Sequence, residues 1–370
     1  MKPSSPAALL RSRSFCSAAS SSARRPLVQR TLRLGVAQNV SPIIPAAPAS
    51  ELNPSTRSPW NQCRHSSHSP MSPTAAPGRN KITINTLRNL YKKGTPITMV
   101  TAHDFPSGLA ADLAGVEIVL VGDSLAMVAL GLEDTNQLTL DAMIHHCKAV
   151  ARGAQTSFLI GDLPMGTYET SPSDAIRSSL RLIQEGRMNA VKLEGGVELV
   201  PTIKHLTSFG IPVLGHVGLT PQRNNSLGGF RVQGKTVESA KKVLHDALAI
   251  QEAGVFGMVL EAVPEEISRM VTEKLNVPTI GIGAGAGTSG QVLVQCDMLG
   301  NWPEGRFMPK FVRKYRDIFK ESMEGIQQFK EEVRSAQYPA VEHTYPMPAA
   351  EVDKFKEWMA TQQEPAKGKE

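Results

Sequence analysis

Short apolar runs that end on a carboxylate recur along this chain, and they constrain its fold more than any other feature. Four such runs are 117–123 (EIVLVGD), 158–162 (FLIGD), 190–194 (AVKLE) and 257–261 (GMVLE). Continuous apolar runs are typical of parallel strands that are buried on both faces of a sheet. An unpaired carboxylate is costly to remove from water. Carboxylates at the same end of successive strands therefore indicate a shared task, most simply holding a metal and a substrate.

Strand and helix patterns alternate from about residue 82 to residue 306. The predicted strands are 97–102, 117–122, 158–161, 190–193, 212–215, 257–260 and 279–282, with a weak eighth at 296–299. The predicted helices between them are 106–113, 140–152, 172–185, 197–208, 237–252 and 264–275. We expect a (β/α)₈ TIM barrel, because residues suited to function follow many strands and a barrel brings all strand ends to one mouth. An open doubly wound sheet is the alternative.

The N-terminal segment differs in composition from the rest of the chain. Residues 1–80 hold ten Lys or Arg and a single acid, Glu51, whereas the remainder holds 30 basic and 33 acidic residues. The net charge of +6 therefore comes from this segment, and the folded part offers no electrostatic case for binding nucleic acid. A segment rich in Ser and Arg and poor in acids is typical of a mitochondrial transit peptide. A disordered basic tail without a targeting role is the alternative.

The pattern divides the chain into three parts. We expect residues 1–80 to be a disordered transit or linker segment, 81–345 to be the catalytic barrel and 346–370 to be a C-terminal tail. Helices predicted at 311–333 and 350–359 form a helical extension after the barrel. No apolar stretch reaches the 18 or so residues of a membrane helix, so no membrane contact is expected. The four cysteines lack metal-binding spacing, which favours reduced thiols.

Asp123 and Asp162 end neighbouring strands and are the first candidates for a metal site. Two carboxylates at adjacent strand ends suit Mg²⁺, which also takes water and substrate oxygens. A helix cap or turn is the alternative for each Asp alone. Lys192 and Glu194 are two residues apart, so their side chains point to the same side of the strand. Glu194 could extend the metal shell and Lys192 could neutralise an acid group of the substrate, with a structural ion pair as the alternative.

His216 and Glu261 follow the fifth and sixth predicted strands. Glycines on both sides of His216 suggest close approach by a ligand, although a lone His at a strand end is more often a plain hydrogen-bonding residue. Glu261 has apolar neighbours, a setting suited to a general base, with a helix cap as the alternative. The glycine-rich segment 281–287 fits either a phosphate site of a barrel or close packing, and it does not match the dinucleotide fingerprint.

Six motifs resemble, in order and spacing, those of the ketopantoate hydroxymethyltransferase family. They are 121–124 (VGDS), 161–164 (GDLP), 191–196 (VKLEGG), 215–222 (GHVGLTPQ), 260–264 (LEAVP) and 281–285 (GIGAG). The resemblance covers roughly residues 82–345. It implies a (β/α)₈ barrel with bound Mg²⁺ and a homo-oligomer, decameric in bacterial relatives. It also implies transfer of a hydroxymethyl group from 5,10-methylenetetrahydrofolate to 3-methyl-2-oxobutanoate through a Mg²⁺-stabilised enolate, in pantothenate and coenzyme A biosynthesis.

The resemblance also implies roles for individual residues. Asp123 and Asp162 would be metal ligands, and Glu194 would complete the metal site. The 2-oxo acid would contact Asp123, Ser124, Asp162 and Lys192, and we add His216 to this set because of its position. Glu261 would accept the proton. The long N-terminal extension, the longer segment 301–306 and the tail after residue 346 depart from the compact bacterial pattern, and the extension suits a eukaryotic organelle form.

Three other functions are consistent with parts of the pattern. Lys192 could form a Schiff base, as in metal-free aldolases, and EDTA and borohydride would distinguish that chemistry. A Mg²⁺-dependent carbon–carbon lyase of the phosphoenolpyruvate-mutase type would share the barrel, the metal and the 2-oxo acid, but no cysteine occupies a strand-end motif here. A non-catalytic binding or scaffold module would not need the full set of strand-end acids, which this chain retains.

Overall fold

The computed structural model describes residues 79–362. The predicted disorder and targeting function of residues 1–80 fall outside this part of the chain except at residues 79 and 80. Residues 363–370 of the predicted C-terminal tail also fall outside it.

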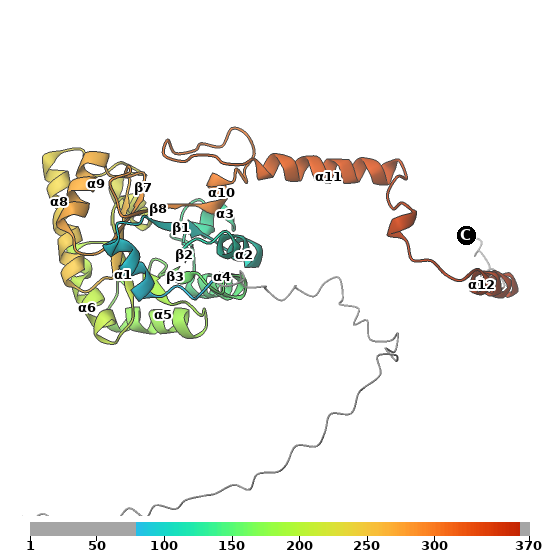
Figure 1. Cartoon of the computed structure of the whole chain (residues 1–370), viewed down its shortest axis with the longest axis horizontal. Coiled ribbons are helices and arrows are strands. Elements are labelled where there is room, and N and C mark those ends of the chain that lie inside the picture. The colour runs from blue at the N-terminus through green and yellow to red at the C-terminus, as the bar shows by residue number, and fades with distance from the viewer. Residues whose placement is uncertain (1–78, 363–370) are drawn as a thin grey trace, which may run out of the picture. The chain divides into compact units, whose positions relative to one another are not determined.

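Within residues 79–362, eight parallel strands form a closed barrel in chain order (Figure 1). The strands are β1 (Ile97–Thr101), β2 (Ile118–Val121), β3 (Phe158–Asp162), β4 (Ala190–Lys192), β5 (Val213–Gly218), β6 (Gly257–Glu261), β7 (Thr279–Ile282) and β8 (Gly290–Leu293). The barrel closes because β8 pairs with β1 as well as with β7. The predicted (β/α)₈ barrel is therefore confirmed, and the open doubly wound sheet is wrong.

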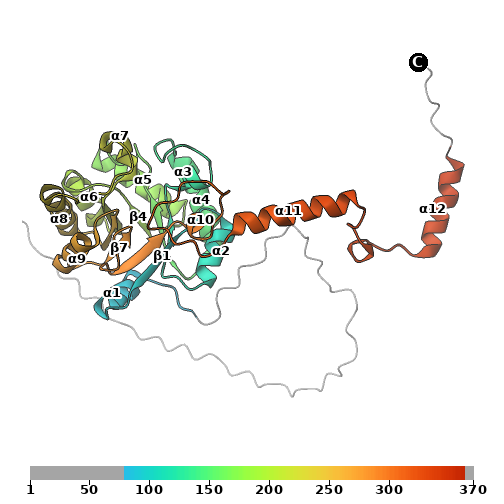
Figure 2. The ribbon, with the colours of Figure 1, turned by 90° about the horizontal axis from the view of Figure 1, so that it is seen from above.

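Helices connect the strands and surround the barrel (Figure 2). The longer connecting helices are α2 (Phe105–Leu113), α4 (Leu140–Gly153), α5 (Pro172–Gln184), α6 (Val200–Ser208), α8 (Val237–Glu252) and α9 (Glu265–Lys274). Single-turn helices are α3 (Leu125–Val128), α7 (Asn224–Leu227) and α10 (Gln295–Met298), with 3₁₀ turns η1 (Val197–Leu199), η2 (Pro221–Arg223) and η3 (Val341–His343). Local sequence starts several of them. The side chains of Thr139 and Ser171 accept hydrogen bonds from backbone N–H groups in the first turns of α4 and α5, where the helix itself supplies few acceptors.

Alternate residues of each strand point into and out of the barrel. In β2, Ile118 and Leu120 pack inside, whereas Val119 and Val121 pack against the surrounding helices. The buried inner cluster consists of Leu87, Ile97, Met99, Ile118, Leu120, Phe158, Ile160, Ala190, Leu214, Val259, Ile280 and Val292. The lower barrel is therefore a packed core and not a pore.

An additional helix, α1 (Ile84–Lys92), covers the amino end of the barrel. Its Leu87 is 1% exposed and belongs to the inner cluster, together with the first residues of β1, β2 and β3. The Thr83 side chain accepts a hydrogen bond from Thr86 N and thereby caps the helix. The sequence predicted only that order begins near residue 82, because no strand precedes this helix to mark a β/α unit.

The eighth strand does not lie where the sequence predicted it. Residues 296–299 fall mainly in α10, and β8 is instead the short segment Gly290–Leu293. A Cβ atom at Gly290 would collide with the carbonyl oxygen of Ile97, so close approach to β1 requires glycine there. A strand that opens with Gly-Gln has too little apolar pattern to be recognised. The prediction of 212–215 was also too short, because β5 continues through His216 to Gly218.

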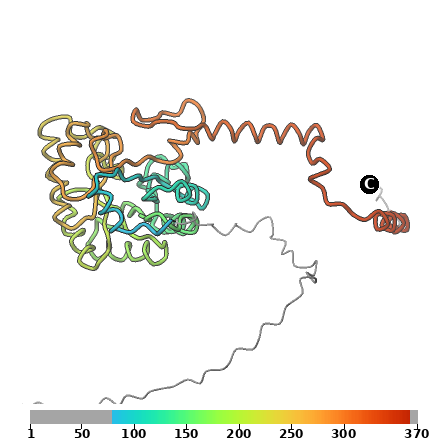
Figure 3. The backbone as a smooth tube through the Cα atoms, in the orientation of Figure 1, coloured from blue at the N-terminus to red at the C-terminus, as the bar shows by residue number. Residues whose placement is uncertain are grey.

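Two helices follow the barrel, α11 (Ile318–Arg334) and α12 (Ala349–Thr361). Figure 3 traces α11 as one regular helix. The helix predicted at 350–359 is confirmed, whereas the helix predicted at 311–333 begins seven residues later than expected. Within residues 79–362, no helix has the length and apolar character needed to cross a membrane. The two cysteines in this range, Cys147 and Cys296, are buried and unpaired.

Candidate active site

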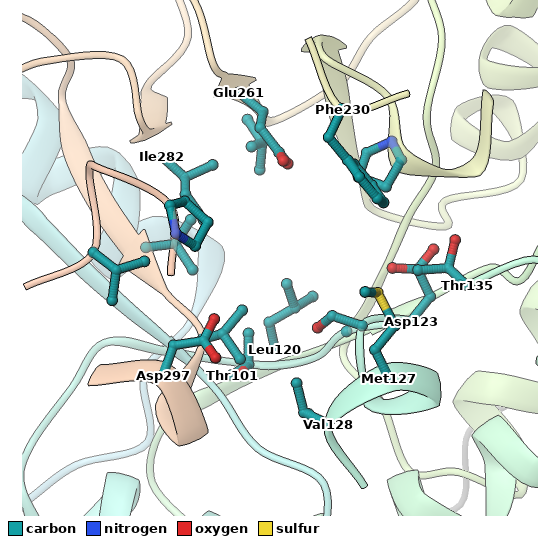
Figure 4. Close-up of a pocket in the computed structure, with 18 of the residues that line it drawn as sticks. Thr101, Leu120, Asp123, Met127, Val128, Thr135, Phe230, Glu261, Ile282 and Asp297 are labelled. Atoms are coloured by element: carbon teal, nitrogen blue, oxygen red, sulfur yellow. The ribbon is translucent and has the colours of Figure 1, made fainter. Parts of the chain in front are cut away.

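One cavity of about 440 Å³ lies at the carboxyl ends of the strands. All seven residues singled out in the sequence line it: Asp123, Ser124, Asp162, Lys192, Glu194, His216 and Glu261. They come from the ends of β2 to β6, and Figure 4 shows part of the cavity wall. The barrel therefore brings together side chains that are far apart in the sequence, as expected of strand ends that share one mouth.

Asp123 and Asp162 are buried side by side at the ends of β2 and β3. Asp123 is 5% exposed and Asp162 is 2% exposed. The backbone N–H of Asp123 donates a hydrogen bond to Asp162 Oδ2 at 3.0 Å. Burial, together with the carboxylates of Glu194 and Asp162, raises the pKa of Asp123 well above its ordinary value. A nearby cation would therefore favour the charged form of this side chain.

Lys192 lies among these carboxylates. Its Nζ is 3.0 Å from Asp162 Oδ1 and 3.7 Å from Glu194 Oε1. Burial alone would lower the pKa of Lys192, but Asp162 and Glu194 outweigh it and raise the pKa above its ordinary value. Asp162 Oδ1 nevertheless lacks an aligned hydrogen bond, so this oxygen can still bind a further cationic partner. The side chains of Lys192 and Glu194 do lie on the same side of the chain, as their spacing predicted.

His216 connects the carboxylates of Glu194 and Glu261. Its Nδ1 is 3.2 Å from Glu194 Oε1, and its Nε2 is 3.2 Å from Glu261 Oε2. Burial alone would lower the pKa of His216, but Glu194 outweighs it and raises the pKa to about 9. Burial would likewise raise the pKa of Glu194, yet His216 and Lys192 lower it overall. His216 is thus a buried cation at neutral pH that positions two acids.

The turn after Glu261 is held in an unusual conformation. Ala262 has a φ of +48°, in the left-handed region, which costs a non-glycine residue about 1 kcal/mol or more. Two backbone hydrogen bonds hold it there, from Ala262 N to the carbonyl of Ile282 and from Gln233 N to the carbonyl of Ala262, both at 2.8 Å. The chain thereby turns sharply at the end of β6, next to the cavity.

The charges around the cavity fit a divalent cation. Four carboxylates and the two cations Lys192 and His216 line this end, which leaves an excess of two negative charges in the fully charged state. Within residues 79–362, no three His, Cys, Asp or Glu side chains form a complete metal cage. Mg²⁺ does not require one, since it commonly takes one or two carboxylates and completes its shell with water and substrate. Asp123 and Asp162 provide such a pair.

The match to a known family accounts for this arrangement. The model of the ketopantoate hydroxymethyltransferase family matches residues 81–341. The chain belongs to the ketopantoate hydroxymethyltransferase family. A relative named 3-methyl-2-oxobutanoate hydroxymethyltransferase from Emericella nidulans is 59% identical over 323 residues, which cover 85% of this chain and 92% of the relative.

Other members of the ketopantoate hydroxymethyltransferase family are similar over the barrel. One from Oleidesulfovibrio alaskensis is 49% identical and covers 70% of this chain and 90% of its own length. One from Oryza sativa subsp. japonica, named as mitochondrial, is 48% identical and covers 74% of this chain and 70% of its own length. A solved structure of a putative phosphonomutase from Burkholderia cenocepacia J2315 has a TM-score of 0.50 at 14% identity, covering 68% of this chain and all of that one. This last likeness concerns the fold alone.

Two site residues of this family member were missed in the sequence. Gln222 is 3% exposed, and its Nε2 donates to Asp123 Oδ2 at 2.8 Å and to the carbonyl of Leu163 at 3.0 Å. Its backbone N–H donates to Glu194 Oε2 at 3.1 Å, and Tyr168 donates its hydroxyl to Gln222 Oε1 at 2.5 Å. The motif 215–222 contained Gln222 without indicating a role, and no local signal marked Tyr168.

The same cavity has a second wall that the sequence did not predict. It includes Asp297 in α10 and Arg306 in the segment that follows. Met127, Val128, Phe230, Phe307 and Phe311 add apolar surface. The sequence marked 301–306 only as longer than in compact members of the family.

Proposed function

We propose that the chain transfers a hydroxymethyl group from 5,10-methylenetetrahydrofolate to 3-methyl-2-oxobutanoate and so forms 2-dehydropantoate for pantothenate and coenzyme A biosynthesis. The observation that carries this proposal is the cluster of Asp123, Asp162 and Lys192, which lines one cavity together with Glu261. This reaction needs a group that binds the substrate carboxylate, a pair of metal ligands and a separate base. The family names of the relatives support the same reaction.

The 2-oxo acid would bind at the end of the cavity that holds Lys192. The pKa of Lys192 is raised, so its ammonium group stays charged and attracts the substrate carboxylate. Ser124 starts the single-turn helix α3 beside Asp123 and would donate a hydrogen bond from its hydroxyl. Asp123 and Asp162 would hold Mg²⁺, with Glu194 beside them. The metal would stabilise the negative charge that develops on the 2-oxo oxygen.

Glu261 would act as the general base. Loss of the C3 proton from the 2-oxo acid is slow without assistance, and a carboxylate within reach accelerates such a step. The Glu261 side chain is 17% exposed and contacts His216 without an aligned hydrogen bond. Its oxygens are therefore free to take the proton, while His216 restrains the carboxylate.

The carbon left by proton loss would then form the new bond. The methylene carbon is bonded to both N5 and N10 of the folate, so both of these bonds break: C3 takes the place of one nitrogen, and water takes the place of the other and supplies the hydroxyl oxygen. The proton removed from C3 and one proton of the water pass to the two nitrogens, and tetrahydrofolate leaves. The apolar wall of the cavity would hold the two reactants in contact. Bringing two substrates together in the right geometry is the main difficulty of such a reaction.

A direct assay tests this proposal. The full-length protein, 3-methyl-2-oxobutanoate and 5,10-methylenetetrahydrofolate should yield 2-dehydropantoate when MgCl₂ is present. EDTA should abolish the product, and added Mg²⁺ should restore it. Undiminished product formation in EDTA would contradict the metal role, and absence of product with Mg²⁺ would contradict the reaction itself.

The other enzymatic functions make different predictions. If Lys192 formed a Schiff base, borohydride with the 2-oxo acid would inactivate the protein permanently, whereas under our proposal it should not. A carbon–carbon lyase of the phosphoenolpyruvate-mutase type would cleave its substrate without folate. The structural likeness to that class concerns the fold alone, so neither alternative has an observation in its favour.

We also propose a mitochondrial location and a homo-oligomer. The basic, acid-poor composition of residues 1–80 supports import, and so does the rice relative named as mitochondrial. Fluorescence imaging of a fusion that carries these residues would test the location. The helix α11 has no buried residue and exposes Phe319, Met323 and Ile326, a pattern that a subunit contact would cover. Light scattering of the full-length protein would test the oligomeric state.

A further inference from the structure

The cavity is larger than a branched 2-oxo acid requires. Its volume of about 440 Å³ falls in the range of sites that hold drug-sized ligands. The buried charges of Asp123, Asp162 and Lys192 account for one end only. Apart from these and the nearby Ser124, Glu194, His216 and Glu261, the wall is apolar except for Asp297, Arg306, Thr101 and Thr135. An apolar wall with a few polar groups suits a flat heteroaromatic ring system.

Asp297 is the acid on this second wall. It lies in α10, just after β8, and lines the cavity. Figure 4 shows Asp297, Glu261 and Asp123 on three sides of one open space. The indole Nε1 of Trp302 donates a hydrogen bond to Asp297 Oδ1 at 3.0 Å. A carboxylate has about four acceptor sites on its two oxygens, so Asp297 can accept further hydrogen bonds from a ligand.

Trp302 and Arg306 hold Asp297 in place. The Arg306 guanidinium lies over the Trp302 ring, 3.3 Å from its centroid, in a cation–π contact. This contact fixes the indole, and the indole fixes the carboxylate. Burial raises the pKa of Asp297, while Trp302 and Arg306 act in the opposite direction. A ligand that donates hydrogen bonds to this carboxylate would further favour its charged form.

The one-carbon donor offers a matching group. The pterin ring of a reduced folate carries a 2-amino group next to an N3–H, and these two parallel donors match the two oxygens of a carboxylate. We propose that Asp297 binds this edge of the pterin, with Trp302 and Arg306 as positioning residues. This inference rests on the proposed function and names how its second substrate is recognised. Lys192 and a bound Mg²⁺ would attract the anionic 2-oxo acid to the other end of the cavity, whereas Asp297 offers it no such partner, so the two substrates would bind at different walls.

Substitution of Asp297 tests the inference by separating two half-reactions. In Asp297→Asn, the KM for 5,10-methylenetetrahydrofolate should rise about 10- to 100-fold, because a charge-assisted pair of hydrogen bonds is lost. The exchange of the C3 proton of 3-methyl-2-oxobutanoate with D₂O should stay within twofold of the unmodified rate. Asp297→Glu should recover part of the KM. An unchanged KM in Asp297→Asn, or an equal loss of proton exchange, would overturn the inference.

Glu304→Gln is the matched control. Glu304 is an exposed acid in the same segment and does not line the cavity, so its removal should change neither the KM nor the proton exchange. Failure of the proposed function has a different result, since the unmodified protein would then form no product. If only this inference is wrong, the unmodified protein and Asp297→Asn should both form product, and their KM values for 5,10-methylenetetrahydrofolate should be equal.

A pterin fragment tests the contact itself. 6-Methyltetrahydropterin should inhibit the unmodified protein in competition with the folate, and its 2-desamino analogue should inhibit about tenfold more weakly. In Asp297→Asn, the two compounds should inhibit equally. A preference of the same size in both proteins would mean that another group reads the 2-amino edge, and it would overturn the assignment to Asp297.

Discussion

At the amino end of the barrel, Phe158 and Leu87 pack among apolar side chains, whereas at the carboxyl end of the same strands Asp162 and Lys192 are buried and charged. Only a few residues of β3 separate Phe158 from Asp162. The amino end gains stability from apolar burial. The carboxyl end places like charges close together, which opposes folding unless a ligand compensates them. In this barrel, the side chains that stabilise the fold and those proposed to react therefore lie at opposite ends of the same strands.

The largest expected effect is at the charged end. Glu261→Gln should reduce C3 proton exchange of 3-methyl-2-oxobutanoate by about 10²- to 10⁴-fold, the usual contribution of a general base. The protein should stay folded, because the glutamine retains the shape of the side chain, although its charged contact with His216 is lost. Exchange is measured by NMR in D₂O, and unfolding by urea titration.

Glu266→Gln provides the control for this substitution. Glu266 is exposed in the first turn of α9, five residues away from Glu261. Its substitution should therefore leave exchange of the C3 proton unchanged. If Glu261→Gln exchanged the C3 proton at the unmodified rate, Glu261 would not be the base, and the assignment of reactivity to this residue would fail.

The amino end should show the opposite result. Phe158→Ala should lower the free energy of unfolding by about 3 to 5 kcal/mol, because it opens a cavity in the inner cluster. The KM for 3-methyl-2-oxobutanoate should remain unchanged in the protein that stays folded. Phe209→Ala is the control. Because Phe209 is 68% exposed, its substitution should change the free energy of unfolding little. A raised KM in Phe158→Ala would show that the two ends are not independent.

Gln222→Leu sharpens the comparison, because it alters a neutral residue at the charged end. It removes the hydrogen bonds to Asp123 and to the carbonyl of Leu163. If Asp123 binds Mg²⁺ as proposed, loss of this hydrogen-bonding partner should reduce the Mg²⁺ affinity by about 10- to 100-fold. Titration of the protein with Mg²⁺, followed by product formation, measures this change. An unchanged Mg²⁺ dependence would mean that Gln222 does not position Asp123.

The smallest effect, taken per pH unit, is a dependence of stability on pH. The folded pKa of His216 is raised from 6.5 to about 9, so His216 stabilises the fold fully below pH 6.5 and loses this contribution as the pH rises through 9. The slope cannot exceed about 1.4 kcal/mol per pH unit, which corresponds to one proton. Urea titrations of protein in EDTA at several pH values measure it. His216→Gln should flatten the slope in this window, and a slope that persists would assign it to another group.

The barrel and the seven cavity residues could be predicted because their signals are local. An apolar run followed by an acid marks a strand end such as Asp123 or Glu261 without knowledge of any partner. β8 could not be predicted, since its pairing with β1 depends on backbone contact at Gly290 and not on an apolar pattern. Helix α1 was missed because its role is to cover the inner cluster, which exists only after the barrel closes.

Sequence analysis missed Gln222 and Asp297 for the same physical reason, which is that their contacts form only in the folded protein. Gln222 and Asp123 are 99 residues apart in the chain and form a hydrogen bond only in the folded state. Asp297 likewise gains its setting from Trp302 and from the cavity. Glutamines, and acids near helix ends, occur at many positions outside functional sites. Their residue type alone therefore does not mark Gln222 or Asp297 as a site residue in a single sequence.

The cover that α1 places on the amino end has a kinetic consequence. With that end filled, the cavity that holds the buried charges opens, within residues 79–362, at the mouth between the strand ends and the 306–312 segment. Two reactants that share one entrance must use it in turn. Under the proposed function, the 2-oxo acid would occupy the deeper position beside Lys192, so it would enter before the folate, and 2-dehydropantoate would depart last. Product-inhibition patterns would record this order, and a random order would contradict it.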